Sequence, residues 1–122
     1  MTRRHAIHDA EPSLITSHGA DFFGQDRHLL ADVVALAPWI ANSGAYDDRQ
    51  ASAPLAAAME ARESLTVPAD AAAVYAEQLL RVSRIRQLRP RASALARALA
   101  DAAARAAADG EPWTWTTEEG AR

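Results

Sequence analysis

The segment from residue 90 to residue 117 limits the possible folds more than any other part of this 122-residue chain. It opens with small apolar residues that recur at helical spacing: Ala92, Leu95, Ala96, Leu99, Ala102, Ala103 and Ala106. Gly110 then ends the helical pattern. In the following segment, Trp113-Thr114-Trp115-Thr116-Thr117, tryptophan and threonine alternate, which is typical of a β-strand with both indoles on one face. A helix with so small a face requires a close helical partner, and the two indoles supply the volume that the alanines lack.

The rest of the chain predicts three more helices and two more short strands. The helices are expected at about 26–37, with Asp26 as the capping residue, at 54–63 after Pro54, and from about 69 to Arg89. The strands are expected at 13–16 and 65–67, and residues 43–53 are expected to form a loop. These elements predict an α+β fold, with about four helices packed on a small, mostly antiparallel sheet of about three short strands. We expect one compact domain over residues 13–117, a flexible N-terminal arm over 1–12 and a C-terminal tail over 118–122.

The composition excludes several classes of protein. Cysteine is absent, so the chain has no disulfide framework, no thiolate nucleophile and no cysteine-based zinc site. The apolar run from Val33 to Ala41 is interrupted by Pro38 and is far shorter than the ~20 residues that span a bilayer. No apolar signal-peptide core follows the charged N-terminus. We therefore expect a soluble, cytoplasmic protein with no membrane partner and no cofactor.

Charge is distributed unevenly along the chain. The net charge is −3, but residues 81–105 carry seven arginines against Asp101, whereas the flanking segments are acidic. The basic residues of the first part of this block are Arg81, Arg84, Arg86, Arg89 and Arg91. All thirteen basic residues are arginine, a bias that GC-rich codons produce, so the block has a compositional explanation as well as a functional one. It predicts contact with an acidic protein, contact with nucleic acid, or neutralisation of the protein's own acidic half.

The aromatic residues offer a second set of interaction candidates. Trp113 and Trp115 lie on the last expected strand, which we expect to be an edge strand and therefore open to strand addition or to a homodimer. Phe22 and Phe23 are adjacent, so on an extended segment one side chain fills the core and the other, taken here as Phe22, is open to a partner. Aromatic residues and arginine are enriched among the residues that dominate binding energy.

A histidine and aspartate cluster follows the first expected strand. Its members are His18, Asp21, Asp26 and His28, and Gly19 and Gly24 permit tight turns around them. Imidazole and carboxylate groups bind metal ions when they converge, and free amides at a helix start bind anions. The spacing matches no known metal motif, and each member also has an ordinary structural explanation as a cap, turn or surface residue.

Three functional interpretations follow. The best supported is a small non-enzymatic binding module, of the regulator, adaptor or inhibitor type, that acts through protein–protein contacts. The alternative is a nucleic-acid-binding accessory protein that uses the arginine-rich segment 81–105. The third is a metal- or anion-dependent activity at the His18/Asp21/Asp26/His28 cluster. Nucleophilic catalysis has little support, because Ser17 and His18 are neighbours on a strand and point to opposite faces.

Overall fold

The computed structural model describes residues 11–119 and confirms the α+β class. The elements in this range are β1 (Ser13–Ser17), β2 (Gln25–Leu29), α2 (Leu30–Asn42), α3 (Tyr46–Ala61), β3 (Leu65–Val67), α4 (Ala69–Ser83), α5 (Pro90–Asp109) and β4 (Trp113–Glu118). The sheet therefore has four strands rather than about three. Most of the expected arm at 1–12 and the end of the expected tail at 118–122 lie outside the described residues.

The four strands form one antiparallel sheet in the order β2-β1-β4-β3. Leu14 of β1 lies opposite His28 on one side and opposite Thr117 of β4 on the other. Because β3 pairs with the free side of β4, with Thr66 opposite Thr114, the last strand is internal. The prediction that it would be an edge strand was wrong, and β2 and β3 are the edges.

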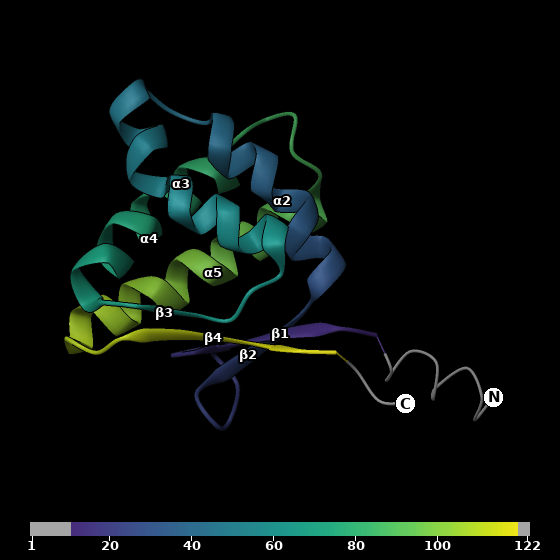
Figure 1. Cartoon of the computed structure of the whole chain (residues 1–122), viewed down its shortest axis with the longest axis vertical. Helices are drawn as coiled ribbons and strands as arrows, with labels where there is room; N and C mark the ends of the chain where they lie inside the picture. Colours follow the sequence, from purple (N-terminus) through teal and green to yellow (C-terminus); the bar gives the residue numbers. More distant parts are fainter. Residues whose placement is uncertain (1–10, 120–122) are drawn as a thin grey trace.

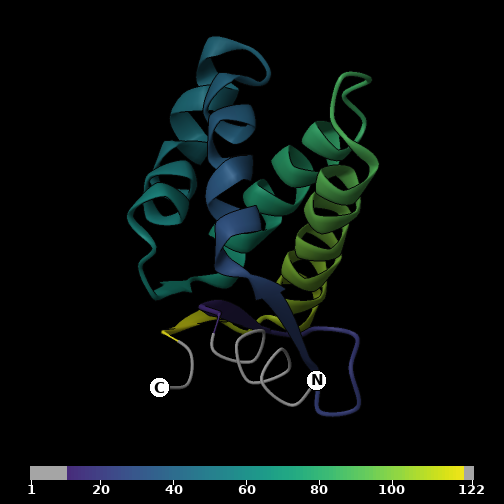
Figure 2. The same ribbon diagram turned by 90° about the vertical axis from the view of Figure 1, so that its right-hand side faces the viewer.

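The helices lie on one face of this sheet as two pairs, α2 with α3 and α4 with α5 (Figures 1 and 2). The alanine face of α5 packs against α4, and Ala96, Ala102 and Ala103 are fully buried there. Trp113 and Trp115 point from β4 into the same core and meet edge to face, with ring centroids 5.3 Å apart. The expected combination of an alanine-rich helix face with two large indoles is confirmed. No helix among the described residues has the length and apolar character needed to cross a bilayer.

The first helix begins four residues later than predicted. Residues 25–29 pair with β1 as strand β2, and the Leu30 amide donates to the Pro12 carbonyl before α2 starts. Asp26 is therefore a strand residue, and the prediction that it caps a helix was wrong. Its carboxylate instead accepts a hydrogen bond from the Ala20 amide at 2.9 Å.

Two helices continue through an internal proline, Pro38 in α2 and Pro54 in α3. α2 continues through Pro38 to Asn42, whose side-chain amide donates to the Pro38 carbonyl at 2.8 Å. α3 begins at Tyr46, eight residues before Pro54, so the loop predicted over 43–53 was mostly wrong. Both prolines are exposed, where the loss of a helical hydrogen bond is least costly.

Both boundaries of α5 are as predicted, whereas α4 is shorter than predicted. Pro90 occupies the first turn of α5, and Gly110 ends the helix in the left-handed conformation with φ 67°. α4 ends at Ser83 rather than near Arg89, because the backbone from Arg84 onward folds into turns. The Ser93 hydroxyl donates to the Ser83 carbonyl and ties the start of α5 to the end of α4.

Candidate interaction surfaces

The connection between β1 and β2, called here the aromatic loop (residues 18–24), is held by a dense set of hydrogen bonds. One oxygen of the Asp21 carboxylate accepts from the amides of Phe23 and Gln25, at 2.8 and 2.7 Å. Backbone bonds close the loop, from Gly19 to the Gly24 carbonyl and from Gly24 to the Asp21 carbonyl, both at 3.0 Å. Gly24 adopts φ 74°, a conformation that glycine reaches without steric cost. The loop is therefore ordered by its own contacts.

This ordered loop presents two aromatic rings to solvent. Phe22 is 94% exposed and Phe23 is 79% exposed, and their rings meet edge to face with centroids 5.2 Å apart. The expectation that one ring would fill the core was wrong, because the pair lies in a loop rather than on an extended strand. A polar residue would satisfy the loop geometry equally well, so the fold does not require phenylalanine at either position. Exposed apolar surface of this kind marks interaction sites in soluble proteins.

The base of the aromatic loop is joined to the far end of α5. His18 has φ 59°, and its ring Nε2 lies 2.7 Å from a carboxylate oxygen of Glu111 and 3.9 Å from one of Asp109. The Arg105 side chain donates to the His18 carbonyl at 2.7 Å. These contacts connect positions about ninety residues apart, and they place two carboxylates and one arginine beside the base of the loop.

The four members of the predicted metal or anion cluster do not come together as a group. Within residues 11–119, the ligand-type atoms that the fold gathers within 4.8 Å of one another belong to His18, Asp109 and Glu111. Asp21 and Asp26 instead accept hydrogen bonds from amides in and beside the aromatic loop. His28 is partly buried on β2, and its Nε2 has no hydrogen-bond partner among the described residues. Burial lowers the pKa of His28, and the nearby charges of Asp26 and Asp32 oppose that shift.

Three arginines of the block form ion pairs with acidic residues of the same chain. Arg81 pairs with Asp48 at 3.2 Å, and Arg91 pairs with Asp32 at 2.7 Å. Arg97 pairs with Asp101 one helical turn away, at 3.5 Å. Half-exposed pairs of this kind contribute little to stability, but they use up charge that a ligand would otherwise meet.

Three arginines at the centre of the block have no ion-pair partner among the described residues. Arg84, Arg86 and Arg89 lie in the connection between α4 and α5, called here the arginine loop (residues 84–89), and all three are exposed. No acidic side chain in residues 11–119 pairs with them. Because α4 ends before this segment, the arginines sit on a loop rather than along the helical stripe that the sequence suggested.

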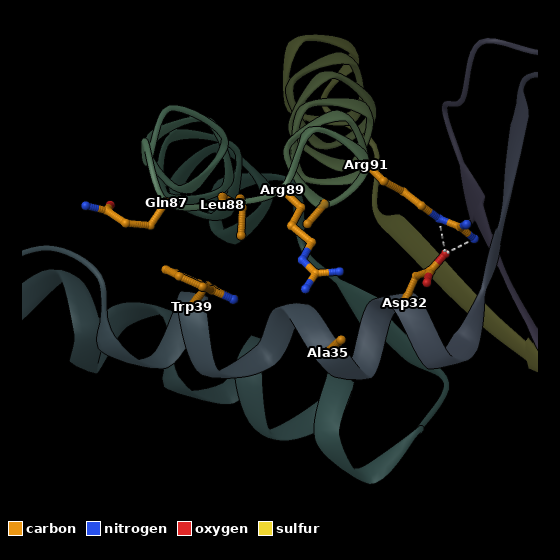
Figure 3. Close-up of a pocket in the computed structure, with 8 residues that line it drawn as sticks. Asp32, Ala35, Trp39, Gln87, Leu88, Arg89 and Arg91 are labelled. Carbon is orange, nitrogen blue, oxygen red and sulfur yellow. Dashed lines mark hydrogen bonds and ion pairs between the residues drawn. The ribbon is translucent and has the colours of Figure 1, made fainter.

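A groove lies between the arginine loop and α2. It has a volume of about 440 Å³ and is called here the Trp39 groove. Its apolar lining comes from Ala35, Trp39, Leu88 and Ala92. Figure 3 shows the Arg89 side chain reaching from the arginine loop toward α2, while Arg91 is turned aside to bond Asp32. Trp39 is 37% exposed, so an aromatic ring and a cation with no acidic partner in residues 11–119 share one opening.

Two of the predicted interaction residues do not reach the surface. Trp113 is fully buried and Trp115 is 2% exposed. Their indole nitrogens have no hydrogen-bond partner among the described residues. Sequence reasoning in turn did not select Phe23 or Trp39 as interaction residues, although the Phe-Phe pair and the proline beside Trp39 were visible signals.

The protein is a small α+β domain in which two helical pairs cover one face of a four-stranded antiparallel sheet, with an aromatic loop and an arginine loop exposed outside that core. The chain belongs to the family described as Domain of unknown function (DUF7739), whose sequence profile matches residues 19–116. The matched range includes Phe22, Phe23 and the whole Trp39 groove. No curated protein and no solved structure matches the chain.

Proposed function

We propose that this protein is a non-enzymatic binding module that acts through protein–protein contacts made by the aromatic loop. The observation that carries the proposal is the near-complete exposure of Phe22 and Phe23 on a loop whose backbone is fixed by hydrogen bonds. A rigid loop loses little conformational freedom when it binds, so more of the contact energy of the two rings becomes affinity. Aromatic anchors of this kind account for most of the binding energy at many interfaces.

The cytoplasm is the proposed location of this contact. The chain has no cysteine, whereas small secreted domains commonly depend on a framework of disulfides.

A photo-crosslinking experiment tests the proposal directly. Phe22 is replaced by p-benzoylphenylalanine, which keeps an aromatic ring at the tip of the aromatic loop, and the protein is irradiated in a lysate of its native host. We expect a crosslinked protein band that excess wild-type protein suppresses and that excess F22S/F23S variant does not. The control places the same photoreactive residue at Tyr46, which is 65% exposed on α3, away from the loop. Absence of any wild-type-competed band at position 22 would overturn the proposal.

Nucleic-acid binding is a second candidate, favoured by the unpaired charges of Arg84, Arg86 and Arg89 beside Trp39. Neutralisation of phosphates releases counterions, so such binding weakens as salt concentration rises. We expect the R84Q/R86Q/R89Q variant to lose both the affinity for nucleic acid and its salt dependence, whereas R97Q, which removes an arginine already paired with Asp101, retains both. Binding that is absent in wild type, or independent of salt, removes this candidate.

A further inference from the structure

The two ends of helix α5 carry opposite charge. Its N-terminal end adjoins the arginine loop, whose three arginines are unpaired in the described part of the chain. Its C-terminal end carries Asp109 and is followed by Glu111, and the aromatic loop with Asp21 lies beside them. Figures 1 and 2 show the arginine loop at the end of the helical layer that is far from the sheet, and the aromatic loop extending beyond the sheet on its other side. A helix of 20 residues is about 30 Å long, so a loop and the groove of the same molecule do not meet.

The Trp39 groove has the chemistry to hold an aromatic ring. Its floor is apolar, with Ala35 on α2 and Leu88 on the arginine loop, and Trp39 offers a ring face for stacking. Arg89 reaches over the opening with an unpaired guanidinium, which favours both an aromatic face and a nearby carboxylate (Figure 3). The groove is therefore complementary to a segment that carries aromatic rings next to acidic groups.

The aromatic loop is such a segment. It carries Phe22 and Phe23 at its tip, and Asp109 and Glu111 lie beside its base. Arg105 also contacts this base, where its side chain donates to the His18 carbonyl. The acidic and aromatic end of one molecule thus matches the basic and apolar end of another in both charge and polarity.

We propose that the aromatic loop of one copy of this protein docks in the Trp39 groove of a second copy, head to tail. The inference rests on the proposed function and names the partner of the same loop. The contact is heterologous, because it joins two different surfaces rather than one surface to itself. In an open assembly, one end copy therefore retains an unoccupied loop and the other an unoccupied groove. The contact area of one loop tip is small, so the affinity is in the range of transient interfaces.

Two variants separate the halves of the contact without disturbing the core. F22S/F23S removes the exposed rings and leaves the groove intact. A35E/R89E introduces charge into the groove and reverses its free cation, and both positions are exposed in wild type. F22S/F23S retains an intact groove and A35E/R89E retains an intact aromatic loop. The two variants therefore bind each other only if the contact joins a loop to a groove. Y46S/V74S is the matched control, because it removes two exposed apolar side chains that lie outside both surfaces.

Sedimentation equilibrium measures the outcome. We expect the average mass of wild type and of Y46S/V74S to rise with concentration, and each of the other two variants alone to remain monomeric. Loss of a hot-spot aromatic residue lowers affinity by roughly 30-fold or more. An equimolar mixture of F22S/F23S and A35E/R89E is expected to form dimers and nothing larger, because each pair retains one intact contact.

Three results overturn this inference: wild type that stays monomeric up to about 1 mM, self-association that F22S/F23S retains, or a variant mixture that stays monomeric while wild type associates. Circular dichroism of each variant establishes that a loss of association is not a loss of folding. A monomeric wild type leaves the proposed function standing if position 22 still crosslinks to another host protein. Failure of both experiments removes both proposals.

Discussion

The Asp21 carboxylate fixes the aromatic loop, and its removal should free the loop without touching either phenylalanine. In D21A the amides of Phe23 and Gln25 lose the shared acceptor that lies 2.8 and 2.7 Å away. The D21N variant is the matched control, because its side-chain oxygen still accepts from both amides at the same chain position. The comparison therefore separates the hydrogen bonds from the size of the side chain.

The expected magnitude follows from the number of bonds and their exposure. A hydrogen bond to a charged group contributes about 1.5–3 kcal/mol when it is sheltered from water. Asp21 is exposed and water screens its charge, so each bond contributes about 1 kcal/mol here. Loss of both bonds then raises the equilibrium constant for opening of the loop by roughly 30-fold, since about 1.4 kcal/mol corresponds to a factor of ten.

Amide hydrogen exchange measured by NMR reports this opening at positions whose acceptors the substitution leaves in place. The Gly19 and Gly24 amides bond to backbone carbonyls, so their exchange depends on loop opening alone. In D21A both amides should exchange roughly 30-fold faster than in wild type, and in D21N the change should be severalfold smaller. If exchange at Gly19 and Gly24 in D21A stays within about threefold of wild type, the carboxylate does not hold the loop and the loop is not preorganised for binding by this residue.

Three further substitutions test the interior and the hairpin. Thr16 is fully buried, and its hydroxyl has no hydrogen-bond partner among the described residues. T16V should therefore stabilise the fold by about 1 kcal/mol and raise Tm by about 4 °C, whereas T114V, at an exposed position, should change Tm little. An unchanged or lower Tm in T16V would contradict this prediction. Burial lowers the pKa of His28 in the folded state, so below about pH 6.5 the unfolded state binds more protons than the folded state does. The contribution of His28 to folding stability is therefore fully present above about pH 6.5 and is lost as the pH falls below that value. Urea unfolding of H28F between pH 5 and pH 7 should therefore show a weaker pH dependence than wild type, and parallel curves would refute it. A Cβ on Gly19 would lie 2.2 Å from the backbone of β2, so G19A should lower the free energy of unfolding by about 3 kcal/mol. G24A should lower it by about 1 kcal/mol, because only the positive φ of Gly24 is unfavourable for alanine. Equal losses of stability in thermal unfolding would contradict the close approach at Gly19.

Patterns within one segment predicted the end of the chain well. Pro90, Gly110 and the alternation of Trp113 and Trp115 each act within a few residues, so α5 and β4 could be placed from the sequence. β2 could not, because the residues from Gln25 to Leu29 have little intrinsic preference for a strand and become one by pairing with β1. The start of α3 was missed because acidic and small residues resemble a loop until Asp48 is seen to accept from the Ala45 amide.

The candidate surfaces depended even more on contacts between distant segments. The sequence around His18 does not indicate that Asp109 and Glu111 lie beside it, because the fold brings these two residues there from the C-terminal end of α5. The pairing of Arg91 with Asp32 likewise joins positions 59 residues apart, and it is this pairing that distinguishes occupied arginines from unpaired ones. The sequence could list the charged residues but not identify which of them remain available.

The internal position of β4 also determines the order in which this protein can fold during synthesis. Ser13 of β1 pairs with Glu118, and β3 has no other strand beside it than β4. A nascent chain can form the β1–β2 hairpin and the first helical pair early, but its sheet stays in two pieces until residue 118 has been made. Until then the buried apolar side chains of Leu14 and Val67 lack Trp113 and Trp115, which belong to the same core cluster in the finished fold. We therefore expect the growing chain to expose apolar surface of the kind that chaperones bind, and a chain that stops before β4 to aggregate rather than to fold as a smaller domain.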